Sequence, residues 1–456
     1  MSFEWAHVRL GDHCTKIGSG ATPKGGKDSY LDSGSYSLIR SQNIYNDRFH
    51  WDGLAFISED QAKKLDSVSV EDGDVLLNIT GDSVARACLA PKNVLPARVN
   101  QHVAIIRPSK EIFDARFVRY FLVSPHEQEL LLGLAGAGAT RNALTKGMIE
   151  NLEVPCPPHQ EQVRIANTLS ALDDRIALLR ETNATLEAIA QAIFKSWFVD
   201  FDPVHAKAEG RLPEGMDEAT AALFSDGFEE SELGLIPRGW AWVPYGNLLT
   251  DTIGGDWGSE VPDEKNNTKV AIIRGTDIPD LQSGAESRVP IRFTTQKKLL
   301  SREVKHGDII LEISGGSKDQ PTGRSLYLSD QMLEQFDCPV EPASFCRLLR
   351  PQSENVGVLL AQHLTYIYSQ GKTWEYQNQS TGISNFQTKH FLENELVALP
   401  PAELLSEFAA TLTPMIKRSH MTQMRSLAQL RDTLLPRLIS GKLRLPEAVA
   451  IMDEIS

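Results

Sequence analysis

The sequence predicts an α+β fold with two β-rich domains in tandem repeat, joined by two long helices that form an antiparallel intramolecular coiled coil. Three observations predict this arrangement. The chain of 456 residues contains two copies of one pattern. Each copy has short β-like runs separated by clusters of Gly, Asn, Asp and Pro. Each copy then ends in a long stretch whose apolar residues recur with helical spacing.

The repeat is visible as matched segments that occur in the same order. GDVLLNITG at 73–81 matches GDIILEISG at 307–315. Other matched pairs are 37–40 with 271–274, 105–108 with 348–351, 142–146 with 385–389, and 154–158 with 397–401. The offset between matched positions is larger after Pro351 than before Gly315, so the second copy contains an insertion between them.

The repeat also predicts the domain boundaries. The predicted parts are a first β-rich domain over 1–158, a spacer helix over 159–200, a connector over 201–238, a second β-rich domain over 239–401, a second spacer helix over 402–444 and a C-terminal tail over 445–456. A Pro-Pro pair closes each β-rich domain. The connector is strongly acidic and contains several Gly and Pro residues, so we expect it to be extended and to lie on the surface.

The first spacer helix has a heptad seam and contains no Pro or Gly between 159 and 198. The seam residues are Leu169, Leu172, Ile176, Leu179, Asn183, Leu186 and Ile193. Asn183 occupies an a position among apolar residues. Either it is buried and fixes the register at a cost in stability, or the helix packs on its own domain and Asn183 is half exposed.

The second spacer helix has a looser seam and contains Pro414 and Pro436. We expect Pro414 to kink or restart this helix, because proline removes a backbone donor and clashes with the preceding turn. Two apolar-striped helices of similar length in one chain are natural partners. Their pairing predicts the antiparallel coiled coil.

Composition excludes several protein classes. The chain is 41% hydrophobic and 23% charged, which is typical of globular domains. It has no run of 18 apolar residues and no basic-then-apolar N-terminus, which predicts neither a membrane span nor a secretory signal. Its five cysteines are scattered and lack zinc-binding spacing. We therefore expect a reduced, cytoplasmic and metal-free protein.

Motifs for catalysis are missing from the sequence. There is no Asn-Pro-Pro-Tyr/Phe motif for amine methylation, no Gly-x-Ser-x-Gly elbow and no dinucleotide fingerprint. The stretch 20–28 resembles a phosphate loop, but Ala21 replaces a required Gly and Asp28 stands where Ser or Thr is needed. These observations favour a binding or assembly protein over an enzyme.

The formal net charge of −14 gives no support for nucleic-acid binding, so any DNA-contacting surface must be local. Side chains with directional donors and acceptors cluster in the loops between β runs. In the first copy the candidate DNA-binding residues are Ser19, Thr22, Lys24, Arg40, Ser41, Gln42, Asn43, Asn78, Thr80, Arg141, Asn142 and Lys146. In the second copy they are Arg274, Thr276, Asn378, Ser384, Asn385, Gln387 and Lys389.

For each of these residues the alternative is a solvated or turn-capping side chain. The pairs Asn142/Asn385 and Lys146/Lys389 keep their chemistry in both copies, which suits a phosphate contact or a helix cap. By contrast, Asn78 in the first copy corresponds to Glu312 in the second. That difference suits the reading of different bases.

Four further segments suggest a family. They are FKSWFVDFDPV at 194–204, AKAEGRLPEGM at 206–216, GLIPRGW at 234–240 and LLPRLISGKL at 434–443. Together with the two-copy plan, they resemble the specificity subunit of type I restriction-modification systems over nearly the whole chain.

The resemblance implies that each β-rich domain is a target-recognition domain for one half of a bipartite double-stranded DNA site. The helices would set the spacer and dock two modification (methyltransferase) subunits, and restriction subunits would complete the complex. S-adenosylmethionine, ATP and Mg²⁺ would then belong to partner subunits, leaving this chain non-catalytic. The alternatives are a diverged methyltransferase fused to its reader, and a coiled-coil adaptor that does not bind DNA.

Overall fold

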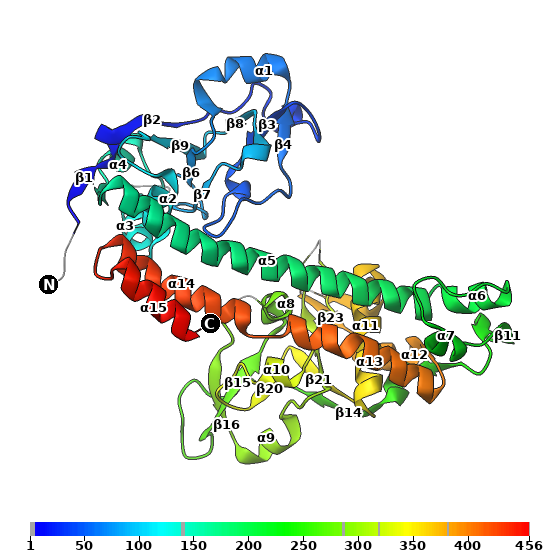
Figure 1. Ribbon diagram of the computed structural model, residues 1–456. Helices are drawn as coiled ribbons and strands as arrows, with labels where there is room; N and C mark the ends of the chain where they lie inside the picture. Colours follow the sequence, from blue (N-terminus) through cyan, green and yellow to red (C-terminus); the bar gives the residue numbers. More distant parts are fainter. Residues whose placement is uncertain (1–4, 138–141, 285–287, 318–319, 381–382, 456) are drawn as a thin grey trace. The chain divides into compact units, whose positions relative to one another are not determined.

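The computed structural model describes residues 5–137, 142–284, 288–317, 320–380 and 383–455. The chain divides into two compact units (Figure 1). Unit 1 comprises Met1–Ile176 with Leu427–Ser456, and unit 2 comprises Ala177–Ser426. Each unit contains one copy of the sequence repeat and has a mixed α+β architecture, which confirms the predicted fold class.

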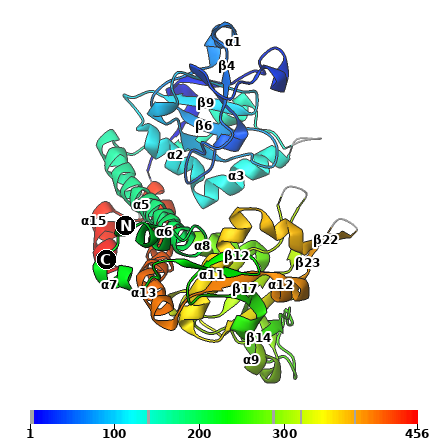
Figure 2. The ribbon, with the colours of Figure 1, turned by 90° about the vertical axis from the view of Figure 1, so that its right-hand side faces the viewer.

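Unit 1 contains two four-stranded sheets and one two-stranded sheet (Figure 2). The first sheet has the order β2 (Cys14–Ser19), β9 (Val103–Pro108), β6 (Val75–Asn78), β7 (Ala87–Leu89). The second has the order β4 (Ala55–Ile57), β3 (Tyr36–Ile39), β8 (Ala97–Val99), β5 (Ser69–Val70). The two-stranded sheet pairs β1 (His7–Arg9) with β10 (Glu153–Pro155).

Most helices of unit 1 cover one face of the first sheet: α2 (Ala115–Val123), α3 (Pro125–Gly136), α4 (Lys146–Glu150), the first part of α5 (His159–Phe198), most of α14 (Gln423–Ile439) and α15 (Leu445–Ile455). The remaining helix, α1 (Glu59–Lys64), instead packs through Ala62 in the core shared with the second sheet. Val75 and Leu77 of β6 join the core formed with the other helices, whereas Leu76 joins the core between the two sheets. The central strand is therefore buried on both faces, which explains its continuous apolar run.

Unit 2 repeats the sheets of unit 1, with a smaller second sheet, and adds a three-stranded sheet and a hairpin. The four-stranded sheet has the order β14 (Leu249–Gly254), β21 (Cys346–Pro351), β17 (Ile309–Glu312), β19 (Ser325–Tyr327). The three-stranded sheets are β16 (Ile291–Thr294), β15 (Thr268–Ile273), β20 (Val340–Pro342), and β18 (Ser314–Gly315), β23 (Ile383–Phe386), β22 (Gln377–Ser380). The pairs are β11 (Phe228–Ser231) with β12 (Gly234–Pro237), and β13 (Ala241–Pro244) with β24 (Leu396–Leu399).

Helices also cover one face of the main sheet of unit 2. The helices of this unit are α6 (Asp202–Ala208), α7 (Glu218–Ala222), α8 (Ile278–Ser283), α9 (Gln296–Arg302), α10 (Asp330–Leu333), α11 (Glu354–Ser369), α12 (Thr388–Asn394), α13 (Ala402–Ser419) and the second part of α5. Ile309 and Leu311 of β17 face the core that contains α11 and α13, whereas Ile310 faces the other core. This alternation matches that of β6.

The sequence repeat is also a repeat of internal geometry. The β2–β9 pairing shifts register after Cys14, and the β14–β21 pairing shifts register after Leu249. In unit 1 the guanidinium of Arg107 forms two hydrogen bonds with the carboxylate of Asp74, at 2.6 and 2.8 Å. Arg350 and Asp308 form the same pair in unit 2, at 3.0 and 2.8 Å. The matched segments thus specify one scaffold in both units.

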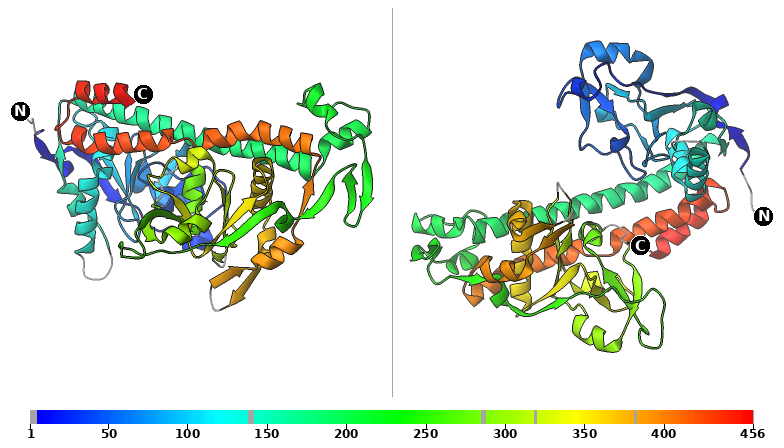
Figure 3. Two further views of the ribbon diagram at one scale, coloured as in Figure 1. Left: turned by 90° about the horizontal axis from the view of Figure 1, so that it is seen from below. Right: turned by 180° about the vertical axis from the view of Figure 1, so that it is seen from behind.

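The long helices pair as predicted. In unit 2, α13 runs alongside the second part of α5 (Figure 3). Asn183 contacts Ser419 near the end of α13, whereas the ring of Trp197 lies 5.7 Å from that of Phe408, so the two helices are antiparallel. In unit 1, the α14 leucines share a core with Ile165, Leu169 and Leu172 of α5.

The prediction that the helix restarts at Pro414 is wrong, because the break in the helix lies further along the chain. Helix α13 contains Pro414 and continues to Ser419, and the interruption falls at 420–422, before α14 begins. Buried Phe408 and Leu412 precede the proline and hold α13 against its neighbours through it. The interruption is held by tertiary bonds: the Gln335 amide donates to the carbonyl of His420 at 3.0 Å.

Two other expectations need correction. The connector over 201–238 is not extended: it forms α6, α7 and the β11–β12 hairpin, because Val204, Phe224 and Ile236 are buried in the core of unit 2. The segment 445–456, expected as a tail, is helical over α15, and Leu445 and Ala448 are buried in the core of unit 1.

Candidate nucleic-acid interface

Several of the predicted loops of unit 1 meet at one end of the sheet β2-β9-β6-β7. Ser19 ends β2 and Asn78 ends β6, and both lie opposite the first residues of the antiparallel strand β9. Thr80 forms a β-bridge with Ala143, next to Asn142. These contacts bring Ser19, the 78–83 loop and Asn142 to the same sheet end.

Hydrogen bonds tie the 40–43 turn to that end. Asn78 is fully buried, and its amide donates to the carbonyl of Ser41 at 2.9 Å and to Oγ of Ser83 at 3.1 Å. Thr80 Oγ1 lies 2.5 Å from Nδ1 of His102, the residue that directly precedes β9. Asn78 therefore assembles the loops from inside, while the side chains around it face outward.

The 40–43 turn has its own internal support. The Asn43 side chain is buried, accepts the N–H of Arg40 at 3.0 Å and donates to the carbonyl of His50 at 2.9 Å. The side chains of Arg40 and Gln42 both donate to the carbonyl of Gly53. The turn leaves Gln42 exposed. We define edge surface 1 by five side chains at this sheet end: the exposed Ser19, Gln42 and Asn142 and the half-buried Thr80 and His102.

Unit 2 builds the equivalent sheet end from different side chains. Glu312 takes the place of Asn78, is 2% exposed and receives two hydrogen bonds from Arg324, at 2.8 and 2.5 Å. Ser314 pairs with Asn385 across β18 and β23, and its hydroxyl donates to Oδ1 of Asn385 at 3.0 Å. Glu312 thus anchors its loop by charge, where Asn78 uses an amide.

The polar residues of the 376–387 region complete this end. The Gln387 amide donates to Oδ1 of Asn378 at 3.0 Å, whereas Ser384 is buried. Arg274 donates to both carboxylate oxygens of Asp277, and these hydrogen bonds raise the pKa of Arg274 above its ordinary value. That pairing leaves Thr276 as the exposed member of the turn. We define edge surface 2 by Thr276, Ser314, Phe345, Asn378, Asn385 and Gln387.

Phe345 was missed by the sequence analysis. Its side chain is 64% exposed, and its carbonyl accepts the N–H of Ile313 at 2.9 Å and of Ser314 at 3.2 Å. His102 holds the same place in unit 1, where its carbonyl accepts the N–H of Ile79. The side chain of Phe345 is apolar, so it lacks the donors and acceptors that marked the other candidates. The available signal was the repeat, which aligns the strand after Phe345 with the strand after His102.

The remaining candidates lie elsewhere on the units or outside the described residues. Thr22 and Lys24 are exposed beyond the end of β2. Lys146 and Lys389 are exposed in the first turns of α4 and α12, at 3.5 and 3.8 Å from the glutamates one turn later. Arg141 lies outside the described residues.

The predicted seam residues of α5 differ in burial. Leu169, Leu172 and Ile176 are buried, and Leu179, Leu186 and Ile193 are half-buried. Asn183 is 9% exposed, and its amide donates to the carbonyl of Ser419 at 3.1 Å. The side chain is therefore buried and satisfied rather than half exposed.

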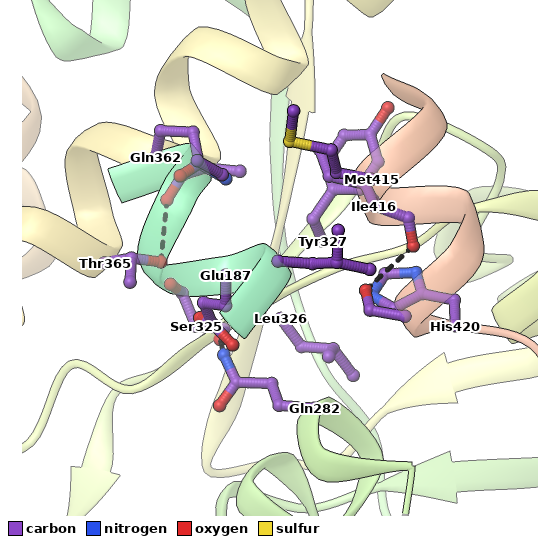
Figure 4. A pocket seen from close by; sticks show the side chains of 14 residues that line it. Glu187, Gln282, Ser325, Leu326, Tyr327, Gln362, Thr365, Met415, Ile416 and His420 are labelled. Carbon is purple, nitrogen blue, oxygen red and sulfur yellow. Dashed lines mark hydrogen bonds between the residues drawn. The ribbon is translucent and has the colours of Figure 1, made fainter. Parts of the chain in front are cut away.

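Figure 4 shows a small cavity in unit 2 beside this seam. Side chains from α5, α8, β19, α11 and α13 line it, among them Glu187, Gln282, Gln362 and His420. Its volume is about 60 Å³, which is room for a few water molecules and not for a nucleotide-sized cofactor. The Gln282 amide donates to the carbonyl of Ser325 at 2.8 Å, so these two polar lining residues are hydrogen-bonded to each other.

The described part of the chain has neither a metal-site cluster nor a membrane-crossing helix. No group of three or more His, Cys, Asp or Glu side chains there has the arrangement of a metal site. None of the helices in those ranges combines the length and the apolar character that a membrane crossing requires.

Known proteins share these features. The model of the type I restriction modification DNA specificity domain matches residues 3–188. The chain is 25% identical over 363 residues to the specificity subunit of the type I restriction enzyme MjaIX of Methanocaldococcus jannaschii, covering 77% of this chain and 74% of that protein. It is 23% identical over 458 residues to the StySPI specificity subunit of Salmonella potsdam, covering 94% and 89%.

A solved structure shares the fold. The S subunit of a type I restriction-modification system from M. genitalium superposes with a TM-score of 0.55 at 17% identity, covering 96% of each chain.

Proposed function

Because this chain belongs to the DNA specificity subunits of type I restriction-modification systems, we propose that edge surface 1 and edge surface 2 each read one half of a bipartite double-stranded DNA site. As a specificity subunit the chain is the non-catalytic component of its complex. The observation that carries the proposal is the equivalence of the two sheet ends. Both rest on the same strand register and the same Asp–Arg pair.

The two surfaces differ where they face outward. Gln42, Thr80 and His102 of edge surface 1 correspond to Thr276, Ser314 and Phe345 of edge surface 2. Side-chain amides and hydroxyls distinguish bases through donors and acceptors, whereas an aromatic side chain does so through apolar contact or stacking. Two units with the same scaffold but different side chains at matched surface positions would suit the recognition of two different half-sites.

The long helices would set the distance between the half-sites. Helix α5 has 40 residues, so it extends about 60 Å at the usual rise per residue. Along the helices, two modification subunits would dock, bind S-adenosylmethionine and methylate adenine N6 in the cytoplasm. Restriction subunits would add the ATP- and Mg²⁺-dependent activity. The net charge of −14 fits a complex in which the partners supply much of the phosphate-binding surface.

Long-read methylome sequencing tests this function. The chain would be expressed with the modification subunit of its own system in cells that lack other adenine methyltransferases. We expect a new split motif with N6-methyladenine in each half. A methylated motif that is continuous, or the lack of any new motif despite a stable complex, would contradict the proposal.

A further inference from the structure

Unit 1 contains a cavity of about 560 Å³ away from edge surface 1. It lies among α3, the α4–β10 region and the end of α14. Leu130, Leu134, Met148 and Ile439 give it an apolar lining. Its acidic side chains are Glu127 and Glu153, His7 and His126 also line it, and no Lys or Arg appears among its described lining residues. Counted with neutral histidines, the formal charge of the lining is negative and complements a cation.

Glu127 is the unusual member of this lining. It is 4% exposed, and its Oε1 is buried without a hydrogen-bond partner among the described residues. Burial raises the pKa of Glu127 to about 7. A buried carboxylate without a partner costs folding free energy, so its presence calls for a function.

We propose that this cavity receives a lysine or arginine side chain of the modification subunit. The aliphatic stem of such a side chain would pack on Leu130, Leu134 and Met148, and its cationic head would pair with Glu127. A protein is the fitting source, because Leu130 of α3 lines the cavity and is 44% exposed, and Leu134, one turn later on the same helix face, is partly exposed beside it. Exposed apolar side chains on one face mark a protein-binding surface more often than a small-molecule site. The inference rests on the proposed assembly with a modification subunit.

The test compares Glu127→Gln with Glu129→Gln in the full chain. Glu129 is an exposed carboxylate on the same helix, so it controls for charge removal from α3. The affinity for the purified modification subunit is measured by isothermal titration calorimetry, and the thermal midpoint of the free chain by calorimetry. We expect Glu127→Gln to weaken the affinity at least tenfold while leaving the midpoint equal or higher. Glu129→Gln should change neither.

The combination of weaker binding and undiminished stability separates a docking role from a structural one. An affinity of Glu127→Gln within twofold of wild type would overturn the inference, and so would a midpoint that falls in parallel with the affinity. A second variant, Leu130→Ser, should weaken binding by several fold because it removes part of the apolar wall. If the wild-type chain itself fails to bind the modification subunit, the proposed assembly is overturned together with this site.

Discussion

The carboxylate of Asp173 on α5 lies 2.9 Å from Nη1 of Arg431 on α14, inside unit 1. The same carboxylate accepts Nη1 of Arg119 on α2 at 3.0 Å and the hydroxyl of Tyr120 at 2.7 Å. Arg119 also donates to the carbonyl of Asn46, in the loop that follows the 40–43 turn. One half-buried carboxylate therefore connects both long helices to the part of unit 1 that carries edge surface 1.

Asp173→Asn should destabilise unit 1 by about 3 kcal/mol, because it leaves the largely buried guanidinium of Arg119 without a counter-charge, whereas Arg431 keeps its pair with Asp432. The side chains of Arg119 and Arg431 are 9% and 20% exposed. The free energy of unfolding is measured in urea. Asp174→Asn is the matched control, since Asp174 is exposed and adjacent. Equal stability of the two variants would show that the Asp173 pairs contribute nothing net.

Acid should destabilise unit 2 through Glu395. Burial acts to raise the pKa of this carboxyl, but hydrogen bonds from His363 (2.7 Å), Lys372 and Tyr376 (2.5 Å) outweigh burial and lower it to about 2. A lowered folded-state pKa stabilises the fold above the ordinary value of 4.5, and that contribution is lost as the pH falls from 4.5 toward 2.

Glu395→Gln should therefore lower the free energy of unfolding at pH 7 by at most about 3 kcal/mol and flatten its decline below pH 4.5. Urea unfolding at pH 7, 4.5 and 3 measures both effects. Glu393→Gln removes an exposed carboxylate near the end of α12, two residues before Glu395, and should leave the wild-type profile unchanged. A Glu395→Gln profile parallel to wild type would contradict the assignment.

Glu341 should have the opposite effect on the pH dependence of the free energy of unfolding. This β20 carboxyl is fully buried without a hydrogen-bond partner among the described residues, and burial, followed by repulsion from Asp256, raises its pKa to about 7. A raised folded-state pKa means that stability falls as the pH rises from 4.5 to 7. Glu341→Gln should remove that fall and raise the free energy of unfolding at pH 8. Glu334→Gln, at an exposed position, should keep it.

Phe345→Ala should weaken binding of the proposed complex with the modification subunits to its DNA site by about 5- to 150-fold, if the ring contributes the ~1–3 kcal/mol typical of an aromatic contact with a base. Fluorescence anisotropy at fixed salt concentration measures the affinity. Leu212→Ala removes an equally exposed apolar side chain, 71% exposed, from the 201–238 segment of unit 2 and should have no effect. Unchanged binding by Phe345→Ala would remove this residue from edge surface 2.

Single substitutions on one edge surface should alter one half-site only. Gln42→Ala should relax methylation specificity in one half of the motif, and Asn385→Ala in the other, because the two side chains lie in different units. Methylome sequencing of cells carrying each variant reads both halves at once. If both variants lost specificity in the same half of the motif, the assignment of one half-site to each edge surface would be contradicted.

The scaffold beneath the candidate site was predictable, because segments that recur in both copies form the same structure in both units. Gly73-Asp74 and Arg107-Pro108 recur in the second copy, and the structure shows their purpose in the Asp74–Arg107 pair. The roles within the loops were less predictable. Asn78 and Glu312 differ between the copies and so favoured base reading, yet both side chains are buried and bonded inside their own unit.

The sequence by itself determined the two-copy α+β plan, the long helices and their antiparallel pairing, because apolar periodicity and repeated segments are local patterns along the chain. Only the tertiary structure decided which polar residues face outward and which brace the loops. Tertiary contacts also let α13 continue past Pro414 to Ser419, and they fold the 201–238 segment into the core of unit 2. Burial and hydrogen-bond partners come from residues distant in sequence, so no local pattern specifies them.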